Sequence, residues 1–192
     1  LASSGQAPEG YYAAGASVDP VNVVISGPRS LVEQIEAVSA TYNPFNLASS
    51  SGVQYSAVPF KLVTADGREI SSKLISVTSE NVLLDTLLVE QTVYPMKFAE
   101  INLTGITKGQ VQAGYTIAGI TAEPAQVRIA GALQEIDSIN ILNLASAIDV
   151  SDMSETVIRA LRVEKPAGAV YLSESAVVVT IEIVPDREEA GE

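Results

Sequence analysis

Cysteine, histidine and tryptophan are absent from the 192 residues of this sequence. The first two absences exclude disulfides, zinc sites built on thiolate or imidazole ligands, haem attachment, and catalysis by Ser-His-Asp or Cys-His arrangements. The third, together with only 3 phenylalanines, leaves little aromatic surface on which sugars or bases could stack. Composition therefore excludes most familiar catalytic centres and disfavours carbohydrate binding.

Basic residues and long apolar runs are also scarce. Lys and Arg number 11 against 23 Asp and Glu, a formal net charge of −12 at pH 7, and such a surface repels nucleic-acid phosphates and anionic lipid headgroups. No stretch reaches the roughly 18 apolar residues that a membrane helix needs, and no secretory leader opens the chain. We expect no nucleic-acid binding and no membrane contact within this sequence. Its start at Leu1 rather than Met leaves open an anchor outside it.

What the sequence does contain is an internal repeat. Its 47% hydrophobic and 18% charged residues are typical of globular protein, and its length allows one domain or two small ones. Shifted by 104 positions, Gly5–Ile35 aligns with Gly109–Ile139, and 11 of the 31 aligned pairs are identical. Ordinary composition yields about two matches by chance over such a span. The chain is therefore predicted to be a tandem duplication.

The same alignment predicts the domain boundaries. Both copies close with β-like runs, Val82–Val89 in the first and Ala176–Ile183 in the second. We therefore expect repeat one at residues 1–90, repeat two at residues 91–185, and an acidic tail or linker at residues 186–192.

Repeat two has a leading strand for which repeat one shows no counterpart. Ahead of Gly109, the residues Ala99, Ile101 and Leu103 alternate with polar neighbours, which is the period of a half-buried strand. Only Leu1–Ser4 precede the first repeat. Either its leading strand lies upstream of this sequence, or the place of that strand is taken by other chain. We expect the corresponding edge of repeat one to be bare, frayed or paired with a strand of another molecule.

Local patterns within each repeat are mainly β. Residues 21–26 and 126–130 alternate between apolar and more polar side chains, as strands with one buried face do. Ser30 and Glu33 form a capping-box pattern ahead of apolar residues at helical spacing, which predicts a short helix. Gln134 replaces the cap in repeat two, so its helix is expected to be weaker or irregular. The expected fold class is mainly β, with two tandem small β domains that each carry a short helix.

Two groups of residues resemble ligand-binding motifs. Asp149 and Asp152 form a carboxylate pair, but the alternating acids, central glycine and distal Glu of an EF-hand are missing, so we interpret them as part of a solvated loop. Gly105, Gly109 and Gly114 form a glycine-rich stretch without the Gly-Lys-Ser/Thr of a phosphate-binding loop. Because repeat one contains a copy of this stretch, a structural turn is the favoured interpretation.

Other candidate residues are few. The triplet at residues 102–104 matches a glycosylation sequon within the expected leading strand. Tyr11, Tyr12 and Tyr115 follow glycines at matching places, and we interpret them as core aromatics whose hydroxyls reach the surface rather than as ligand-stacking residues. Neither Ser-x-x-Lys nor Gly-x-Ser-x-Gly occurs. We predict that the chain is not an enzyme, with no catalytic, metal-binding or cofactor-binding residues, and the partner-binding residues stay undetermined.

The order of these motifs resembles the YbbR-like domain family. In each copy Gly-Tyr is followed by an acid and Pro, then by a strand ending in Gly, and then by a short helix containing Ile. These residues are Gly10-Tyr11, Asp19-Pro20, Gly27 and Ile35 in repeat one, and Gly114-Tyr115, Glu123-Pro124, Gly131 and Ile139 in repeat two. The resemblance covers nearly the whole chain in two copies and implies small, mainly β domains of the YbbR-like type.

The resemblance also implies a function. YbbR-like domains usually occur as tandem copies on the outer side of a Gram-positive-type bacterial membrane, and one type of member regulates the membrane-bound diadenylate cyclase that makes cyclic di-AMP. The chain is then expected to be a non-enzymatic extracytoplasmic interaction module, tethered by a segment outside it, with a membrane protein such as the cyclase as partner and no cofactor. The alternative is a structural or adhesive spacer on the cell surface, whose repeats only set reach.

Overall fold

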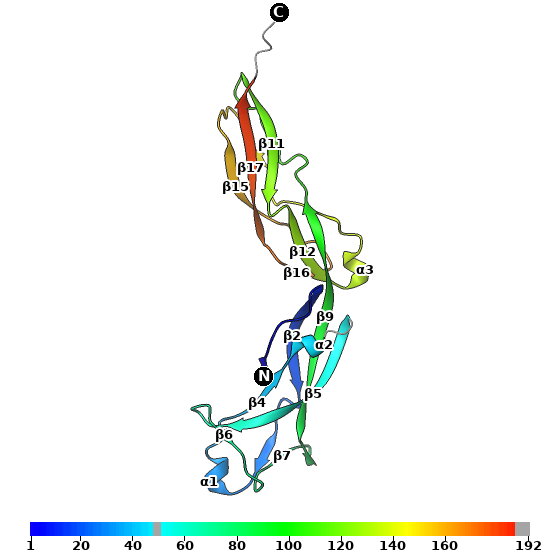
Figure 1. Ribbon diagram of the computed structural model, residues 1–192, viewed down its shortest axis with the longest axis vertical. Coiled ribbons are helices and arrows are strands. Elements are labelled where there is room, and N and C mark those ends of the chain that lie inside the picture. The colour runs from blue at the N-terminus through cyan, green and yellow to red at the C-terminus, as the bar shows by residue number, and fades with distance from the viewer. Residues whose placement is uncertain (48–50, 187–192) are drawn as a thin grey trace, which may run out of the picture. The chain divides into compact units, whose positions relative to one another are not determined.

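A computed structural model describes residues 1–47 and 51–186 of the chain. The chain forms two compact units, Leu1–Pro95 and Met96–Glu192. Strands predominate in both, and the helices α1, α2 and α3 have only 4 residues each (Figure 1). The mainly β fold in two domains is therefore confirmed. Of the expected acidic tail at residues 186–192, only Asp186 lies within the described residues.

Unit one is built around long antiparallel strands. The first part of β9 pairs with β2 on one side and with β5 on the other, and β5 also pairs with β4. A separate three-stranded sheet has the order β3-β7-β8. The elements are β1 (Ala2–Ser3), β2 (Tyr11–Asp19), β3 (Val24–Ser26), α1 (Arg29–Val32), β4 (Ala37–Tyr42), α2 (Pro44–Leu47), β5 (Gly52–Val63), β6 (Glu69–Ile70), β7 (Ser76–Ser79), β8 (Val82–Leu83) and β9 (Thr86–Ile101).

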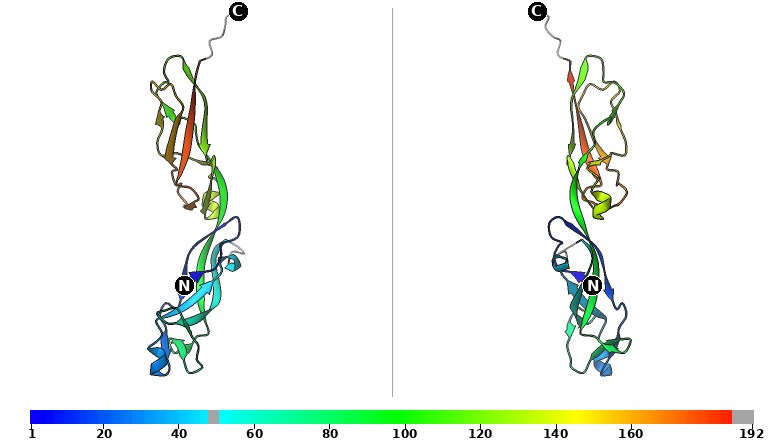
Figure 2. Two further views of the ribbon diagram at one scale, coloured as in Figure 1. Left: turned by 60° about the vertical axis from the view of Figure 1, so that its left-hand side comes forward. Right: turned by 90° about the vertical axis from the view of Figure 1, so that its right-hand side faces the viewer.

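Unit two repeats this plan. Strand β17 pairs antiparallel with β11 and β15, and β12 pairs antiparallel with the last part of β9 and with β16 (Figure 2). The elements are β10 (Thr107–Lys108), β11 (Tyr115–Glu123), β12 (Gln126–Gly131), α3 (Leu133–Ile136), β13 (Ile141–Leu142), β14 (Ile148–Asp149), β15 (Val157–Arg162), β16 (Ala169–Leu172) and β17 (Ala176–Pro185).

The closing strand of repeat one differs from the expected one. Val82–Leu83 form β8, and the strand that pairs with β2 begins at Thr86 and runs past residue 90. Tyr11 faces Pro95 just as Tyr115 faces Pro185, so the counterpart of β17 is the part of β9 up to Pro95. Matching Val82–Val89 with Ala176–Ile183 was therefore wrong in register. The units divide after Pro95, whereas the sequence pattern put the division at residue 90.

The capping-box prediction was wrong. Helix α1 has Pro28 at its N-cap without any side-chain cap hydrogen bond, and Glu33 instead pairs with Arg29, whose Nε lies 2.6 Å from Glu33 Oε1. Helix α3 likewise has no side-chain cap hydrogen bond and has the same length as α1, so the two copies do not differ in these respects. The helical spacing does not extend further because residues from Ala37 onward pair with β5 as a strand.

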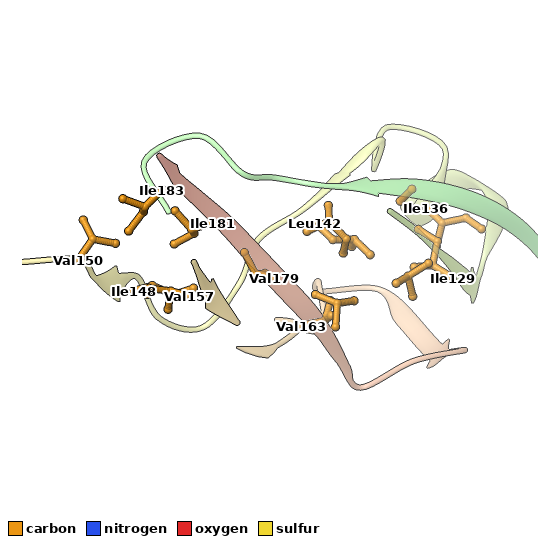
Figure 3. Packing of buried hydrophobic residues seen from close by; sticks show 14 residues of the cluster. Ile129, Ile136, Leu142, Ile148, Val150, Val157, Val163, Val179, Ile181 and Ile183 are labelled. Atoms are coloured by element: carbon orange, nitrogen blue, oxygen red, sulfur yellow. The ribbon is translucent and has the colours of Figure 1, made fainter. Parts of the chain in front are cut away.

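The two units differ in the size of their cores. Among residues 1–47 and 51–186, fourteen buried hydrophobic residues form one cluster in unit two, and Figure 3 shows Val179, Ile181 and Ile183 of β17 within it. The corresponding cluster of unit one has five such residues: Ala40, Tyr42, Val58, Leu87 and Val89. Burial of apolar surface is the main favourable term in folding. Unit two therefore has the larger share of hydrophobic stabilisation.

The leading-strand prediction is confirmed. Ala99 and Ile101 lie in β9, where they are buried and where β9 pairs with β12, whereas Leu103 follows the end of the strand. In unit one the strand corresponding to β12 is β3, which pairs with β7 alone among the described residues. The other edge of β3 is therefore bare. No helix within residues 1–47 and 51–186 combines the length and apolar character of a membrane span.

Candidate functional site

Asp149 and Asp152, the carboxylate pair of repeat two, take part in hydrogen bonds that hold a loop. Asp149 Oδ1 accepts hydrogen bonds from the Ser151 backbone N–H at 3.0 Å and from Ser151 Oγ at 2.6 Å. The Asp152 backbone N–H donates to the Gln110 carbonyl, and Asp152 has a left-handed φ of 57°. Residues 1–47 and 51–186 contain no group of three or more acids placed to hold a metal ion. This geometry agrees with the interpretation as a solvated loop.

The hydrogen bonds from Ser151 lower the pKa of Asp149 below its ordinary value of 3.8. Folding thus favours the ionised carboxylate, so its contribution to stability is present above pH 3.8 and is lost as the pH falls through the lower folded value. We expect an NMR titration to place the Asp149 carboxyl midpoint below 3.8, and Ser151→Ala to raise it toward that value. Asp66, whose pKa is lowered by Thr64, is the internal control. A midpoint unchanged by Ser151→Ala would contradict this.

The glycine-rich stretch forms turns. Gly105, Gly109 and Gly114 all have positive φ, as have Gly5 and Gly10 at the corresponding places of repeat one. A Cβ at Gly109 would collide with Ser151 Oγ and lie 2.9 Å from Asp149 Oδ1. Glycine is therefore required here by backbone conformation and by the close approach of the Asp149 loop, which supports a structural interpretation.

The tyrosines agree with the expectation from sequence, whereas the sequon does not lie within a strand. Tyr115 is half-buried and packs against the core of unit two, as expected. Tyr11 and Tyr12 are also half-buried. The sequon lies just after β9 rather than within it, and Asn102 Nδ2 donates to Asn143 Oδ1 at 2.9 Å. The Asn102 side chain thus takes part in a turn.

A buried polar residue escaped the sequence analysis. Gln91 of β9 has only 2% of its surface exposed, and its Nε2 donates to the Ala14 carbonyl at 2.9 Å and to the Tyr42 hydroxyl at 3.0 Å. Its Oε1 is buried and has no partner within the described chain. Gln91 faces Ala16 as Ile181 faces Ile120 in repeat two. A glutamine at an inward position of an alternating strand was the signal that could have revealed it.

The repeat comparison predicts how Gln91 responds to substitution. We expect Gln91→Ala to lower the free energy of unfolding of unit one by about 2–3 kcal/mol, because it leaves a cavity and removes the donor to Tyr42. Gln91→Ile loses the same donor, but it keeps the core filled and removes the unsatisfied oxygen, so it should stay within about 1 kcal/mol of the natural chain. Chemical denaturation followed by NMR signals of unit one measures both. Equal losses of unfolding free energy in the two variants would show that the hydrogen bonds of Gln91 contribute more than its packing.

Unit one exposes large apolar side chains around its smaller sheet. Leu74 before β7 is 69% exposed, and Val82 and Leu83 of β8 are 63% and 62% exposed. Leu83 also lines an open hollow of about 270 Å³, together with Ile75 and Val77. Clustered exposed apolar side chains mark interaction surfaces in soluble proteins, and Val82 and Leu83 are neighbours in β8. We refer to Leu74, Val82 and Leu83 as the β8 surface.

The fold thus defines a class: a tandem-repeat protein of two small, mainly β units with a turn-forming glycine pattern in each. The sequence matches the family described as YbbR-like protein over residues 1–82 and again over residues 100–181. The chain belongs to the YbbR-like family, in two tandem copies.

Two solved structures are similar to the chain. The solution structure of SuR18C from Streptococcus thermophilus has 19% sequence identity and a TM-score of 0.40, and the match covers 52% of this chain and 93% of that one. The crystal structure of a YbbR-like protein from Streptococcus pneumoniae TIGR4 has 13% sequence identity and a TM-score of 0.33. That match covers 97% of this chain and 92% of the other chain. No curated protein sequence matches the chain.

Proposed function

We propose that this chain is a non-enzymatic extracytoplasmic interaction module, part of a membrane-anchored regulator of a diadenylate cyclase. Membership in the YbbR-like family supports this proposal, since the resemblance implies such a regulator. The single observation that carries it is the β8 surface, where Leu74, Val82 and Leu83 are each more than 60% exposed. Burying such side chains against a partner contributes roughly 1.5–3 kcal/mol each.

The charge of the chain bears on the kind of partner. With a net charge of −12, the module associates faster with a basic partner surface than with an acidic one, and added salt slows the encounter. The apolar contacts of the β8 surface would then govern the dissociation rate.

The alternative is a structural or adhesive repeat spacer on the cell surface. A spacer contributes only its length, so the exposed apolar residues of the β8 surface have no role in it. The two functions therefore differ in their response to surface substitutions that leave the fold intact.

The test is the cyclic di-AMP output of membranes that contain the diadenylate cyclase and the anchored regulator. We expect Val82→Asp with Leu83→Asp to abolish the regulator's effect on output and its co-purification with the cyclase. Ile158→Asp in β15 is the matched control, because Ile158 is 57% exposed outside the β8 surface, and it should leave both unchanged. Retained regulation by the double variant, or by an unrelated linker of equal reach, would overturn the interaction module and favour the spacer.

A further inference from the structure

Strand β3 of unit one has a free edge, whereas the corresponding edge of β12 in unit two is paired with another strand. In unit two, β12 lies between β9 and β16. Its counterpart β3 pairs with β7 on one side, and no strand of residues 1–47 or 51–186 pairs with its other side. The same sequence pattern is therefore a central strand in one unit and an edge strand in the other.

The burial of the two strands reflects this difference. Val127 and Ile129 of unit two have no exposed surface. Their identical counterparts Val23 and Ile25 are only half-buried, and the neighbouring Val24 is 61% exposed. An edge strand with uncovered apolar side chains invites pairing with another strand.

The backbone groups at this edge can be assigned from repeat two. The Arg128 backbone N–H donates to Ser173 Oγ, and the Ser173 backbone N–H donates to the Arg128 carbonyl. Both backbone groups of Arg128 therefore point toward the β16 side. Ladder bonds alternate along an antiparallel strand, so the N–H and C=O of Ile129 point the other way, toward Lys97 of β9. By the repeat alignment, the N–H and C=O of Ile25 point out of the free edge of β3.

The position of Leu1 shows where an added strand would continue. Ala2 and Ser3 pair in parallel with Thr41 and Tyr42, as Glu100 and Ile101 pair with residues 141–142. The Ser4 N–H donates to the Tyr42 carbonyl at 2.7 Å, matching the 2.8 Å bond from Asn102 to Leu142. Leu1 thus corresponds to Ala99. Met96, Lys97 and Phe98 come directly before Ala99 and pair with β12. The three residues of an added strand that would pair with β3 therefore come directly before Leu1.

We propose that the free edge of β3 is an acceptor for an extended segment joined to Leu1, which runs antiparallel to β3 and has the chemistry of Met96–Phe98. In unit two, Lys97 Nζ donates to the Asp137 carbonyl at 2.8 Å and to Asn140 Oδ1 at 3.0 Å, beyond helix α3. The residues after α1 are acidic, with Glu33 and Glu36. A basic residue between two apolar ones therefore suits this edge.

Strand β9 indicates which element supplies such a segment. Its residues 86–95 close unit one by pairing with β2 and β5, and its residues 96–101 lead unit two by pairing with β12 and β13. One strand thus serves two repeats. The segment that β3 would accept is accordingly of the same kind as residues 96–98, which continue a closing strand.

The experiment grafts Pro95–Phe98 directly ahead of Leu1 in the full chain and measures amide hydrogen exchange. We expect exchange of the Ile25 amide to slow by roughly fivefold or more, the effect of one net ladder hydrogen bond. The matched control grafts the sequence of residues 185–188, which also begins with Pro but continues with Asp, Arg and Glu. This acidic graft should leave Ile25 unchanged, and Ile129 is the internal reference.

Three outcomes would overturn the proposal that the free edge of β3 accepts such a segment. Equal protection of Ile25 by both grafts would show that the chemistry of the strand is irrelevant. No protection by the Pro95–Phe98 graft, with Val58 and Leu87 amides still protected and unit one thus folded, would show that the edge takes no strand. Protection of the natural chain by a free Pro95–Phe98 peptide to the same extent would show a partner site in trans, since linkage otherwise adds an effective concentration of roughly millimolar.

Discussion

Replacing Ile129 by alanine should lower the free energy of unfolding of unit two by about 4 kcal/mol. Ile129 has no exposed surface and belongs to the cluster of fourteen buried residues, so the missing atoms leave a cavity within that cluster. The same change at Ile25, its half-buried counterpart on β3, should cost unit one only about 1 kcal/mol. The repeat provides this matched pair within one chain.

The two units must be followed separately to measure this difference. Chemical denaturation monitored by isoleucine and valine methyl NMR signals gives a midpoint for each unit of the full chain. We expect Ile129→Ala to move the midpoint of unit two while unit one keeps its own. Equal losses at Ile129 and Ile25 would contradict the open edge of β3, because they would mean that both isoleucines are covered alike.

Gly131→Ala should destabilise unit two by about 3 kcal/mol or more, because overpacking against backbone cannot be relieved by a rotamer change. A Cβ at Gly131 would collide with the Gly168 carbonyl oxygen and lie 2.6 Å from Ile136 Cγ2. Gly168 in turn has a φ of +85°, and its backbone lies against Glu135. Strand β12, helix α3 and the turn before β16 therefore meet with no space for a methyl group.

Gly119→Ala is the control for this prediction. The nearest atom to a Cβ at Gly119 is Glu182 Oε2 at 3.9 Å, an ordinary contact. We expect this change to be neutral or to stabilise unit two by up to about 1 kcal/mol, since alanine has less conformational freedom in the unfolded chain. Thermal unfolding monitored by circular dichroism compares the two variants. A similar loss at both positions would show that strand propensity, and not the close packing at Gly131, is responsible.

The candidate sites were predictable to different degrees. Asp149 and the glycine stretch carried recognisable motifs with missing parts, and those missing parts already indicated loops and turns. The β8 surface carried no such signal, because Val82 and Leu83 look like any closing strand. Only the pairing of β9 with β2 shows that Val82 and Leu83 lie outside that strand and are exposed. Exposure depends on neighbours that are distant in the sequence.

By itself, the sequence determined that this chain is a mainly β duplication with no imidazole or thiol chemistry, since periodicity, repeated glycines and composition are local properties. The tertiary structure decided the rest. Ser30 and Glu33 form a capping pattern that the fold does not use, because Pro28 and strand β4 limit the helix. Ile25 and Ile129 share residue type and pattern, yet only Ile129 is fully buried. An alternating pattern selects which face of a strand turns inward, whereas the neighbouring strands, placed by register over long sequence separation, decide how fully the side chains of that face are buried.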